Sequence, residues 1–269
     1  MAFKRLDPED FIVSSDSVTS TVWSNNSPSL NTYFTSSTQK EGTSGPYYLS
    51  VYQTASNSIS AAVQFQIAYA NKNGGGGVNF DSSVPFVSPT TTIYGQYRTL
   101  VLEDENASFT WGPTYTGSAD NDFYVISIER ARYKQSLLPG SLNLILSSSN
   151  EDENPLRLTD DSNQVTLPTF YGTMRAYQLI SGSNGSSHDG GDGFTTNSGS
   201  YGIVLPDIST ILLNASALND NSQFGGGINL QTNSGSDTFG DNPTKLYDHI
   251  AGSVSVIPLP NPTTSNIFE

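Results

Sequence analysis

Residues 93–147 carry the strongest structural signal of the chain and read IYGQYRTLVLEDENASFTWGPTYTGSADNDFYVISIERARYKQSLLPGSLNLILS. It is the longest run of the chain that is dense in apolar and aromatic residues. Apolar residues alternate along one face at Tyr124, Ile126 and Ile128, and again at Leu142, Leu144 and Leu146. Such alternation is typical of half-buried strands, so the stretch predicts a series of β-strands.

A tight turn joins these two runs at Leu138, Pro139, Gly140 and Ser141. Proline fixes φ at the first central position of a type II turn, and glycine supplies the positive φ of the second. The turn therefore predicts that the chain reverses direction between two strands.

The same alternating pattern recurs on both sides of the central stretch. Val63, Phe65, Ile67 and Tyr69 would line one face of the clearest half-buried strand. Further predicted strands lie at residues 47–52, 156–159, 164–167, 175–180, 201–205, 210–213 and 252–257, with a turn at 160–163. These patterns predict an all-β protein built on an antiparallel β-sandwich or jelly-roll-like domain.

Two segments depart from the strand pattern. Residues 80–92 contain Pro85 and Pro89 and indicate an extended connector. Residues 242–252 are the single helix candidate, because Asn242 suits the N-cap, Pro243 the first helical position and Gly252 the C-cap.

The composition and charge of the chain argue against several classes of function. The chain has 269 residues, no cysteine and a formal net charge of −14, with 11 basic against 25 acidic residues. Without cysteine there is no disulfide or thiolate metal site, and too few cations gather to favour a nucleic-acid surface. No apolar run is long enough to predict a signal peptide or a membrane span, and no motif predicts a cofactor.

Glycine-rich segments lie at residues 74–77, 181–200 and 219–240. The first lacks the Lys-Ser/Thr pair of a phosphate-binding loop, so a flexible loop is favoured. The second places Asp189 and Asp192 near His188, which leaves a Ca²⁺ loop as the alternative to a plain surface loop. The third predicts a mobile loop, or one ordered only by a neighbouring protein.

Domain organisation follows from where regular alternation begins and ends. Residues 1–46 predict an extended N-terminal arm, residues 47–257 the main β domain with a possible subdivision near 147–155, and residues 258–269 a tail. The arm could bury Trp23, Tyr33 and Phe34 against a neighbouring subunit. The alternative is a loosely paired edge strand of the same domain.

Four basic residues concentrate in the central stretch: Arg98, Arg130, Arg132 and Lys134. On a strand, the last three would share one face. They are candidates for an interface with acidic partners, and the alternative is a solvated sheet face.

Few residues of the sequence are suited to a catalytic site. Only His188 and His249 could serve a nucleophilic triad, and neither stands in a recognisable catalytic motif. Neighbouring carboxylates such as Asp160 and Asp161 leave a polysaccharide depolymerase as a disfavoured alternative. The sequence predicts a protein that is not an enzyme.

Several segments together resemble virion structural proteins of T4-like contractile-tailed phages, of the kind that infect marine cyanobacteria. The resemblance is carried, in chain order, by residues 1–10 (MAFKRLDPED), 94–102 (YGQYRTLVL), 123–134 (FYVISIERARYK), 138–142 (LPGSL) and 201–207 (YGIVLPD).

This resemblance implies a structural subunit of the virion, assembled in the host cytoplasm and in contact with copies of itself and with other virion proteins. It favours the tail or baseplate, with the head or neck, as a decoration, vertex or collar protein, as the alternative. A carbohydrate-binding or host-adhesion module is the competing function, because β-sandwiches often serve that role.

Overall fold

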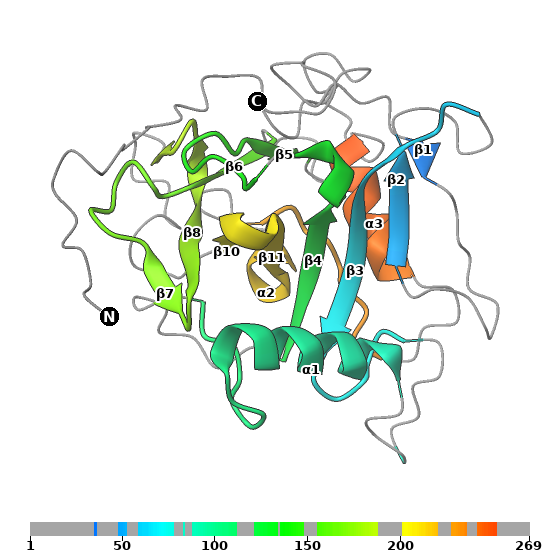
Figure 1. The fold of residues 1–269 in the computed structure, drawn as a ribbon. Helices are drawn as coiled ribbons and strands as arrows, with labels where there is room; N and C mark the ends of the chain where they lie inside the picture. Colours follow the sequence, from blue (N-terminus) through cyan, green and yellow to red (C-terminus); the bar gives the residue numbers. More distant parts are fainter. Residues whose placement is uncertain are drawn as a thin grey trace, which may run out of the picture.

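The computed structural model describes residues 35–36, 48–52, 59–77, 83, 88–111, 121–133, 135–147, 155–187, 201–219, 227–235 and 241–251 (Figure 1). Eleven strands lie in this part of the chain: β1 Thr35–Ser36, β2 Tyr48–Tyr52, β3 Val63–Asn71, β4 Asp122–Ile128, β5 Leu144–Leu146, β6 Leu156–Asp160, β7 Thr169–Tyr171, β8 Met174–Ser183, β9 Ser186–Ser187, β10 Gly202–Leu205 and β11 Thr210–Asn214. The helices described are α1 Pro89–Leu102, α2 Ala215–Asn219 and α3 Asp241–Ala251, with 3₁₀ turns η2 Arg130–Arg132 and η3 Pro206–Ile208.

All described strands belong to one antiparallel sheet that curls across the molecule (Figure 1). The strand order is β1-β2-β3-β4-β11-β10-β8-β6-β5, and β7 and β9 each pair with β8 beside this path. The all-β class is therefore confirmed. The described strands form one curled sheet, which does not confirm the sandwich or jelly-roll arrangement.

β4 lies at the centre of the hydrogen-bonded network and is apolar on both faces. Its backbone pairs with β3 on one side and with β11 on the other. Tyr124 and Ile126 project into one core, whereas Phe123 and Val125 project into a second core on the opposite face. Both faces of the sheet must therefore be covered at this point.

The larger core covers the face that carries Tyr124 and Ile126. Phe65 and Ile67 of β3 and the strands around them contribute to it, and Leu246 and Ile250 of α3 pack on the same core. α3 contacts β2, β3 and β5, so this helix closes that face near the edge of the sheet. Burial of each such side chain contributes roughly 1.5–3 kcal/mol.

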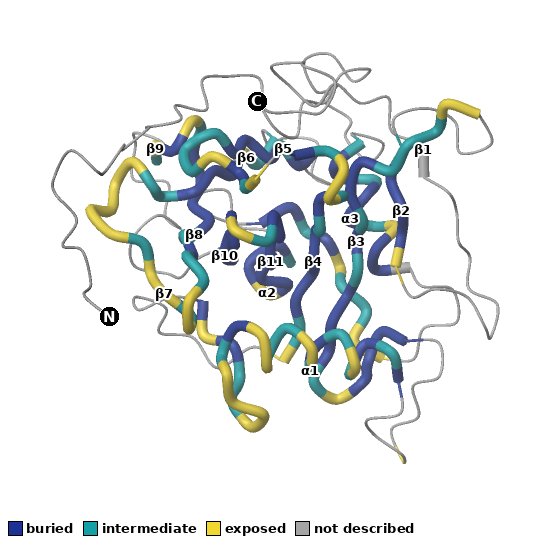
Figure 2. Tube along the Cα trace, in the orientation of Figure 1, coloured by how far each residue is buried: buried dark blue, intermediate teal, exposed yellow. Residues whose placement is uncertain are grey.

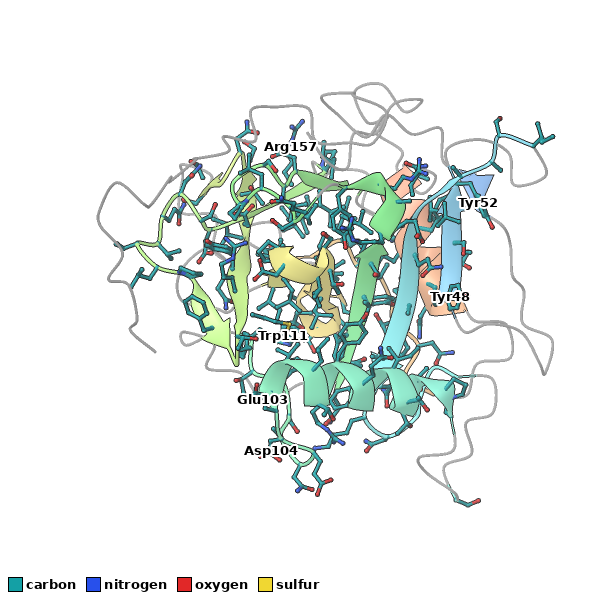
Figure 3. The ribbon with its side chains drawn as sticks, in the orientation of Figure 1. Tyr48, Tyr52, Glu103, Asp104, Trp111 and Arg157 are labelled. Atoms are coloured by element: carbon teal, nitrogen blue, oxygen red, sulfur yellow. The ribbon has the colours of Figure 1, made fainter. Side chains whose placement is uncertain are left out.

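The second core is mainly aromatic. Phe123 lies 4.7 Å from Phe109 and 5.3 Å from Tyr94 between ring centroids, and Trp111 stacks on Phe109 at 5.4 Å. Trp111 lies beside α1, which crosses the strands near one end of the sheet (Figure 3). Aromatic pairs of this kind add about 0.5–1.5 kcal/mol each beyond their buried area.

The helix α1 corrects two sequence-based predictions, the extended connector at 80–92 and the start of the series of strands predicted for residues 93–147. Both are wrong where they overlap Pro89–Leu102. Ser88 takes the N-cap position and Pro89 begins the helix, a start signal that the sequence contained. The buried side chains Tyr94 and Val101 are seven residues apart, which is two helical turns, and so they face the sheet together.

Two further strand predictions are wrong. Residues 164–167 are irregular, with Val165 and Leu167 exposed, and the nearest strand is β7. Arg130–Arg132 forms the 3₁₀ turn η2 and not part of a strand, because β4 ends at Ile128. The idea that Arg130 and Arg132 share one strand face therefore fails.

Most of the other predicted elements are confirmed, with small shifts at their ends. These are the strands at 47–52, 63–69, 124–128, 156–159, 175–180, 201–205 and 210–213, the reversal at 138–141 and the helix beginning near Asn242. In the reversal, Gly140 has φ 85° and Ser141 N donates to Leu138 O at 3.2 Å. The helix near Asn242 is one of three helices in the described residues, not a single one.

The glycine-rich segment after β3 is buried and hydrogen-bonded, which corrects the prediction of a flexible loop there. Asn71 Oδ1 accepts hydrogen bonds from Asn73 N at 2.9 Å and Gly75 N at 3.1 Å. Gly76 N donates to Gly235 O at 2.6 Å, which joins this segment to the glycine-rich segment at residues 219–240. In that segment Ile228 and Leu230 are buried in the larger core.

Several predictions lie outside the described residues. They concern the arm apart from Thr35–Ser36, the candidate residues Trp23, Tyr33, Phe34 and Lys134, the loop at 188–200, and everything after residue 251. The domain boundaries stay predictions. β5 and β6, on either side of residues 148–154, pair with each other in the same sheet.

Two glycine variants compare an open position on α1 with a tightly packed position in the glycine-rich segment after β3. We expect Gly95→Ala to raise the free energy of unfolding by about 0.5–1 kcal/mol, because Gly95 lies in α1 with open space around it. Gly76→Ala should lower it by about 1–3 kcal/mol, since Gly76 has φ 70° and a Cβ there would lie 2.7 Å from Asn233 O. Urea titration measures both, and equal effects would contradict the packing described for Gly76.

Candidate interaction surfaces

The basic residues singled out in the sequence do not form one stripe. Arg130 stacks on Tyr133, with its guanidinium carbon 4.7 Å from the ring centroid, and its Nη1 donates to Tyr133 O at 2.8 Å. Arg132 follows on the same 3₁₀ turn, and its buried Nε has no hydrogen-bond partner among the described residues. The pair therefore forms a short basic turn at the end of β4, and its role at an interface stays a prediction.

Arg98 lies elsewhere, on α1. Its guanidinium carbon lies 5.8 Å from the centroid of the Tyr94 ring on the same helix. α1 covers the aromatic core, whereas η2 follows β4. Arg98 is therefore on a different element from Arg130 and Arg132, although all three are in one stretch of the sequence.

Three turns meet beside the start of β5 and the ends of β6 and β8. They comprise residues 138–141, 161–165 and 183–186, and we call them the turn cluster. The buried carboxylate of Asp160 holds the first turn, since Gly140 N donates to both of its oxygens at 2.8 and 2.9 Å. Ser162 N donates to the same carboxylate at 3.1 Å, which ties the second turn to the first.

Asp161 fixes the second turn to β8. Its carboxylate accepts a hydrogen bond from Gln178 N at 2.9 Å, and its backbone N donates to Gln178 O at 3.0 Å. Burial raises the pKa of Asp161 to about 6, and the neighbouring Asp160 carboxylate also raises it, while the bond from Gln178 lowers it. Two carboxylates thus lie side by side in this cluster.

Asparagine side chains join the third turn to the others. Asn143 and Asn184 exchange two hydrogen bonds, at 2.7 Å between their side chains and at 2.8 Å from Asn184 N to Asn143 Oδ1. Asn163 Nδ2 donates to Asn184 O at 2.9 Å. Asn184 and Gly185 both have positive φ, which is the type I′ geometry of a two-residue hairpin.

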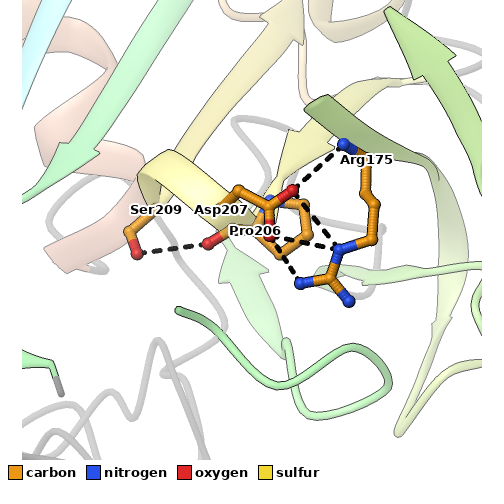
Figure 4. A network of polar contacts seen from close by, with 4 residues as sticks. All are labelled: Arg175, Pro206, Asp207 and Ser209. Atoms are coloured by element: carbon orange, nitrogen blue, oxygen red, sulfur yellow. Dashed lines mark hydrogen bonds and ion pairs between the residues drawn. The ribbon is translucent and has the colours of Figure 1, made fainter. Parts of the chain in front are cut away.

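An ion pair between Arg175 and Asp207 holds the start of β8 against η3. Arg175 at the start of β8 contacts the Asp207 carboxylate through its side chain at 2.5 Å and through its backbone N at 3.1 Å (Figure 4). Hydrogen bonding lowers the pKa of Asp207 and raises that of Arg175. Because both side chains are partly exposed, the pair contributes about 0–1 kcal/mol, mainly to the position of the β7–β8 hairpin.

Exposed apolar side chains occur in the chain from the turn at 138–141 to β7. Seven large apolar residues are exposed in the described part of the chain, and four come from residues 138–170. These four, which we call the apolar rim, are Leu138 at 58%, Val165 at 38%, Leu167 at 76% and Phe170 at 57% exposed. Figure 2 shows the mostly exposed segment that leads into β7 at one side of the molecule.

A shallow hollow lies beside the rim. Its walls are apolar and come from the turn at 138–141, from β10 and from η3, and Asp160, Ser141 and Tyr177 supply its polar groups. Leu138 belongs to both the rim and the wall of the hollow. The region therefore combines exposed apolar surface with a buried carboxylate.

His249, one of the two histidines of the chain, has a structural position. Its Nδ1 lies 2.5 Å from Ser147 O, and Ser147 Oγ and N both donate to His249 O at 2.9 Å. These bonds fasten α3 to the end of β5. His188, Asp189 and Asp192 lie outside the described residues.

No group of three or more His, Asp or Glu side chains among the described residues is arranged to hold a metal ion. Among the same residues, no helix has the length and apolar character needed to cross a lipid bilayer.

Neither the turn cluster nor the apolar rim was predicted from the sequence. Asn184-Gly185 is a strong hairpin signal that low complexity obscured. The bond between Asp160 and Gly140 joins residues 20 apart and depends on strand pairing, so no local pattern reports it.

Comparison of the chain with protein-family models, with curated proteins and with solved structures gives no significant match.

The histidine contact predicts a pH dependence. Burial lowers the pKa of His249 from its usual value, although the bond to Ser147 O opposes this. The unfolded chain therefore takes up a proton first, and His249 makes the free energy of unfolding fall as the pH drops below about 6.5. His249→Asn keeps a donor for Ser147 O and should remove this part of the pH dependence.

His249→Ala is the matched control. It leaves the Ser147 carbonyl without this donor, so it should lower the free energy of unfolding by about 1–3 kcal/mol at pH 8 as well as at pH 5. Denaturant titration across this range measures all three proteins. An unchanged pH profile in His249→Asn would show that the histidine does not titrate as described.

Proposed function

We propose that this chain is a non-enzymatic structural subunit of a contractile-tailed phage particle, and that it lies in the tail or baseplate. The observation that carries the proposal is the turn cluster with its apolar rim. Exposed Val165 belongs to the turn cluster and exposed Leu167 follows it in the chain, so apolar surface adjoins turns that backbone hydrogen bonds hold in place, and this surface needs no ordering before contact. Such a surface is what a repeated subunit needs.

The segments that resemble phage structural proteins converge on this region. Residues 123–134 supply β4, the central strand. Residues 138–142 and 201–207 supply most of the walls of the hollow, including Leu138, Pro139, Val204 and Pro206. The resemblance therefore falls on the scaffold and on the candidate contact surface together, which supports a role in assembly.

The charge of the chain bears on how copies would pack. Each copy carries a formal net charge of −14, so neighbouring copies repel unless cations or apolar groups lie at their contacts. Arg130 and Arg132 on η2 are candidates for such contacts with acidic partners. The same requirement would apply in the head or neck, which are the alternative locations.

A carbohydrate-binding or host-adhesion module is the second candidate, and one feature favours it. Tyr48 and Tyr52 lie on the same face of β2, near one edge of the sheet (Figure 3). Tyr48 is 40% exposed. An aromatic ring that combines an apolar face with a polar hydroxyl suits contact with sugars.

Immunogold labelling of intact contractile-tailed particles tests the proposal. Antibodies raised against the purified chain should label the tail or the baseplate, and antibodies depleted on the same chain are the control. Label confined to the head or neck would correct the location. If the chain is absent from purified particles and binds glycans in a manner lost in Tyr48→Ala, the adhesion function replaces the proposal.

A further inference from the structure

The chain contains two Asn-Gly pairs, and the structure places them in different environments. They are Asn73-Gly74, in the turn after β3, and Asn184-Gly185, in the hairpin between β8 and β9. Asparagine is chemically labile in such a pair. The glycine has no side chain to hinder its backbone nitrogen, so this nitrogen can approach the side-chain carbonyl carbon of the asparagine. The sequence alone does not distinguish the two pairs.

The reaction to which such a pair is prone is deamidation through a succinimide. The glycine nitrogen loses its proton to solvent base and attacks the asparagine Cγ. The new C–N bond closes a ring, and the Cγ–Nδ2 bond breaks as ammonia leaves with a proton from solvent. Water then opens the ring at either carbonyl carbon, which gives aspartate or isoaspartate. The reaction therefore requires an asparagine side chain that can turn and a glycine N–H that can leave its acceptor.

In the β8–β9 hairpin, hydrogen bonds hold both reacting groups. Gly185 is buried, and its N donates to Oγ1 of the buried Thr159 at 2.8 Å. Asn143 Nδ2 donates to Asn184 Oδ1 at 2.7 Å, and Asn184 N donates to Asn143 Oδ1 at 2.8 Å. Reaction at Asn184 must first break the bonds to Thr159 and Asn143, which leaves a buried N–H without an acceptor.

The turn after β3 holds its reacting groups less firmly. Asn73 is exposed, and its side-chain amide forms no hydrogen bond with the described residues, although its backbone N donates to Asn71 Oδ1 at 2.9 Å. Gly74 N donates to Asn71 O at 3.2 Å, which is the long end of the usual range for such bonds. The Asn73 amide can therefore turn towards Gly74 N without losing a bond.

We propose that Asn73 is a site of spontaneous deamidation in the folded chain, and that the hydrogen bonds to Thr159 and Asn143 protect Asn184 from the same reaction. The modification needs only water and base, so it does not depend on the proposed function. Each event replaces a neutral amide by a carboxylate and makes a chain with a formal net charge of −14 more negative.

The isoaspartate product would disturb the packing of the glycine-rich segment after β3. Isoaspartate at position 73 lengthens the main chain by a methylene group just before this segment. A Cβ on Gly75 would clash with Ser234 O, and Gly76 N donates to Gly235 O at 2.6 Å, so the segment has little room to shift. The Gly76 amide should therefore exchange its hydrogen faster in the isoaspartate form than in the unmodified chain.

Peptide mapping of the full-length chain tests the proposal. The folded chain is incubated at mildly alkaline pH in water enriched in heavy oxygen, so that every succinimide opened during the incubation gains a labelled oxygen. We expect label at position 73, as a mixture of aspartate and isoaspartate, and labelling at position 184 slower by about tenfold or more. In guanidinium chloride both positions should be labelled at similar rates.

Two results would overturn the proposal. Labelling at position 184 of the folded chain that is as fast as at position 73, or faster, would show that the hydrogen bonds of the hairpin give no protection. Label at position 73 that is confined to the denatured chain, or absent from both states, would show that the turn after β3 does not react.

Variants of Thr159 test the source of the protection. Thr159→Val removes the acceptor of Gly185 N and should speed labelling at position 184 in the folded chain, whereas Thr159→Ser keeps a hydroxyl and should not. Asn73→Gln is the control for the other pair, because its longer side chain closes a larger ring more slowly. It should abolish label at position 73 and leave position 184 unchanged. Equal labelling at position 184 in the two Thr159 variants would contradict the role given to this bond.

Discussion

The strand β4 is buried on both of its faces, and this burial determines how the other elements are arranged. Tyr124 and Ile126 lie in one core, and Phe123 and Val125 lie in the other. Exposure of either face of the strand to water would therefore be unfavourable. Its backbone groups pair with β3 and β11 on either side. A strand of this kind is stable only if both of its faces are covered, which explains why α1 with the aromatic residues lies on one face and α3 on the other.

The same constraint determines where polar groups are found. Tyrosines at the end of the sheet keep their hydroxyls bonded, as Tyr69 donates to Asp122 at 2.7 Å and Tyr124 lies 2.9 Å from Thr232 Oγ1. Bonds of this type hold the loop at 227–235 against the core. With both faces of the sheet covered, contact with other molecules falls to its edges and turns. The turn cluster provides such a surface, and this is the physical basis of the assembly role that we propose.

The sequence predicted most strands because alternation survives where one face is apolar and the other mixed, as in β3. It missed α1 because Ile93, Tyr94 and Tyr97 favour strands by propensity, whereas their spacing along a helix decides the outcome. It missed the turn cluster for a different reason. The bonds of Asp160 to Gly140 and of Asn143 to Asn184 depend on strand register, which a single sequence does not reveal.

Native-state hydrogen exchange tests the central role of β4 most directly, because it measures the free energy of opening at each backbone amide. We expect the slowest exchange in β4 and β11, at the rate set by global unfolding. The amides of the exposed segment at 164–171 should exchange faster in the isolated chain. Exchange in β4 as fast as in that segment would contradict the claim that the fold is organised around this strand.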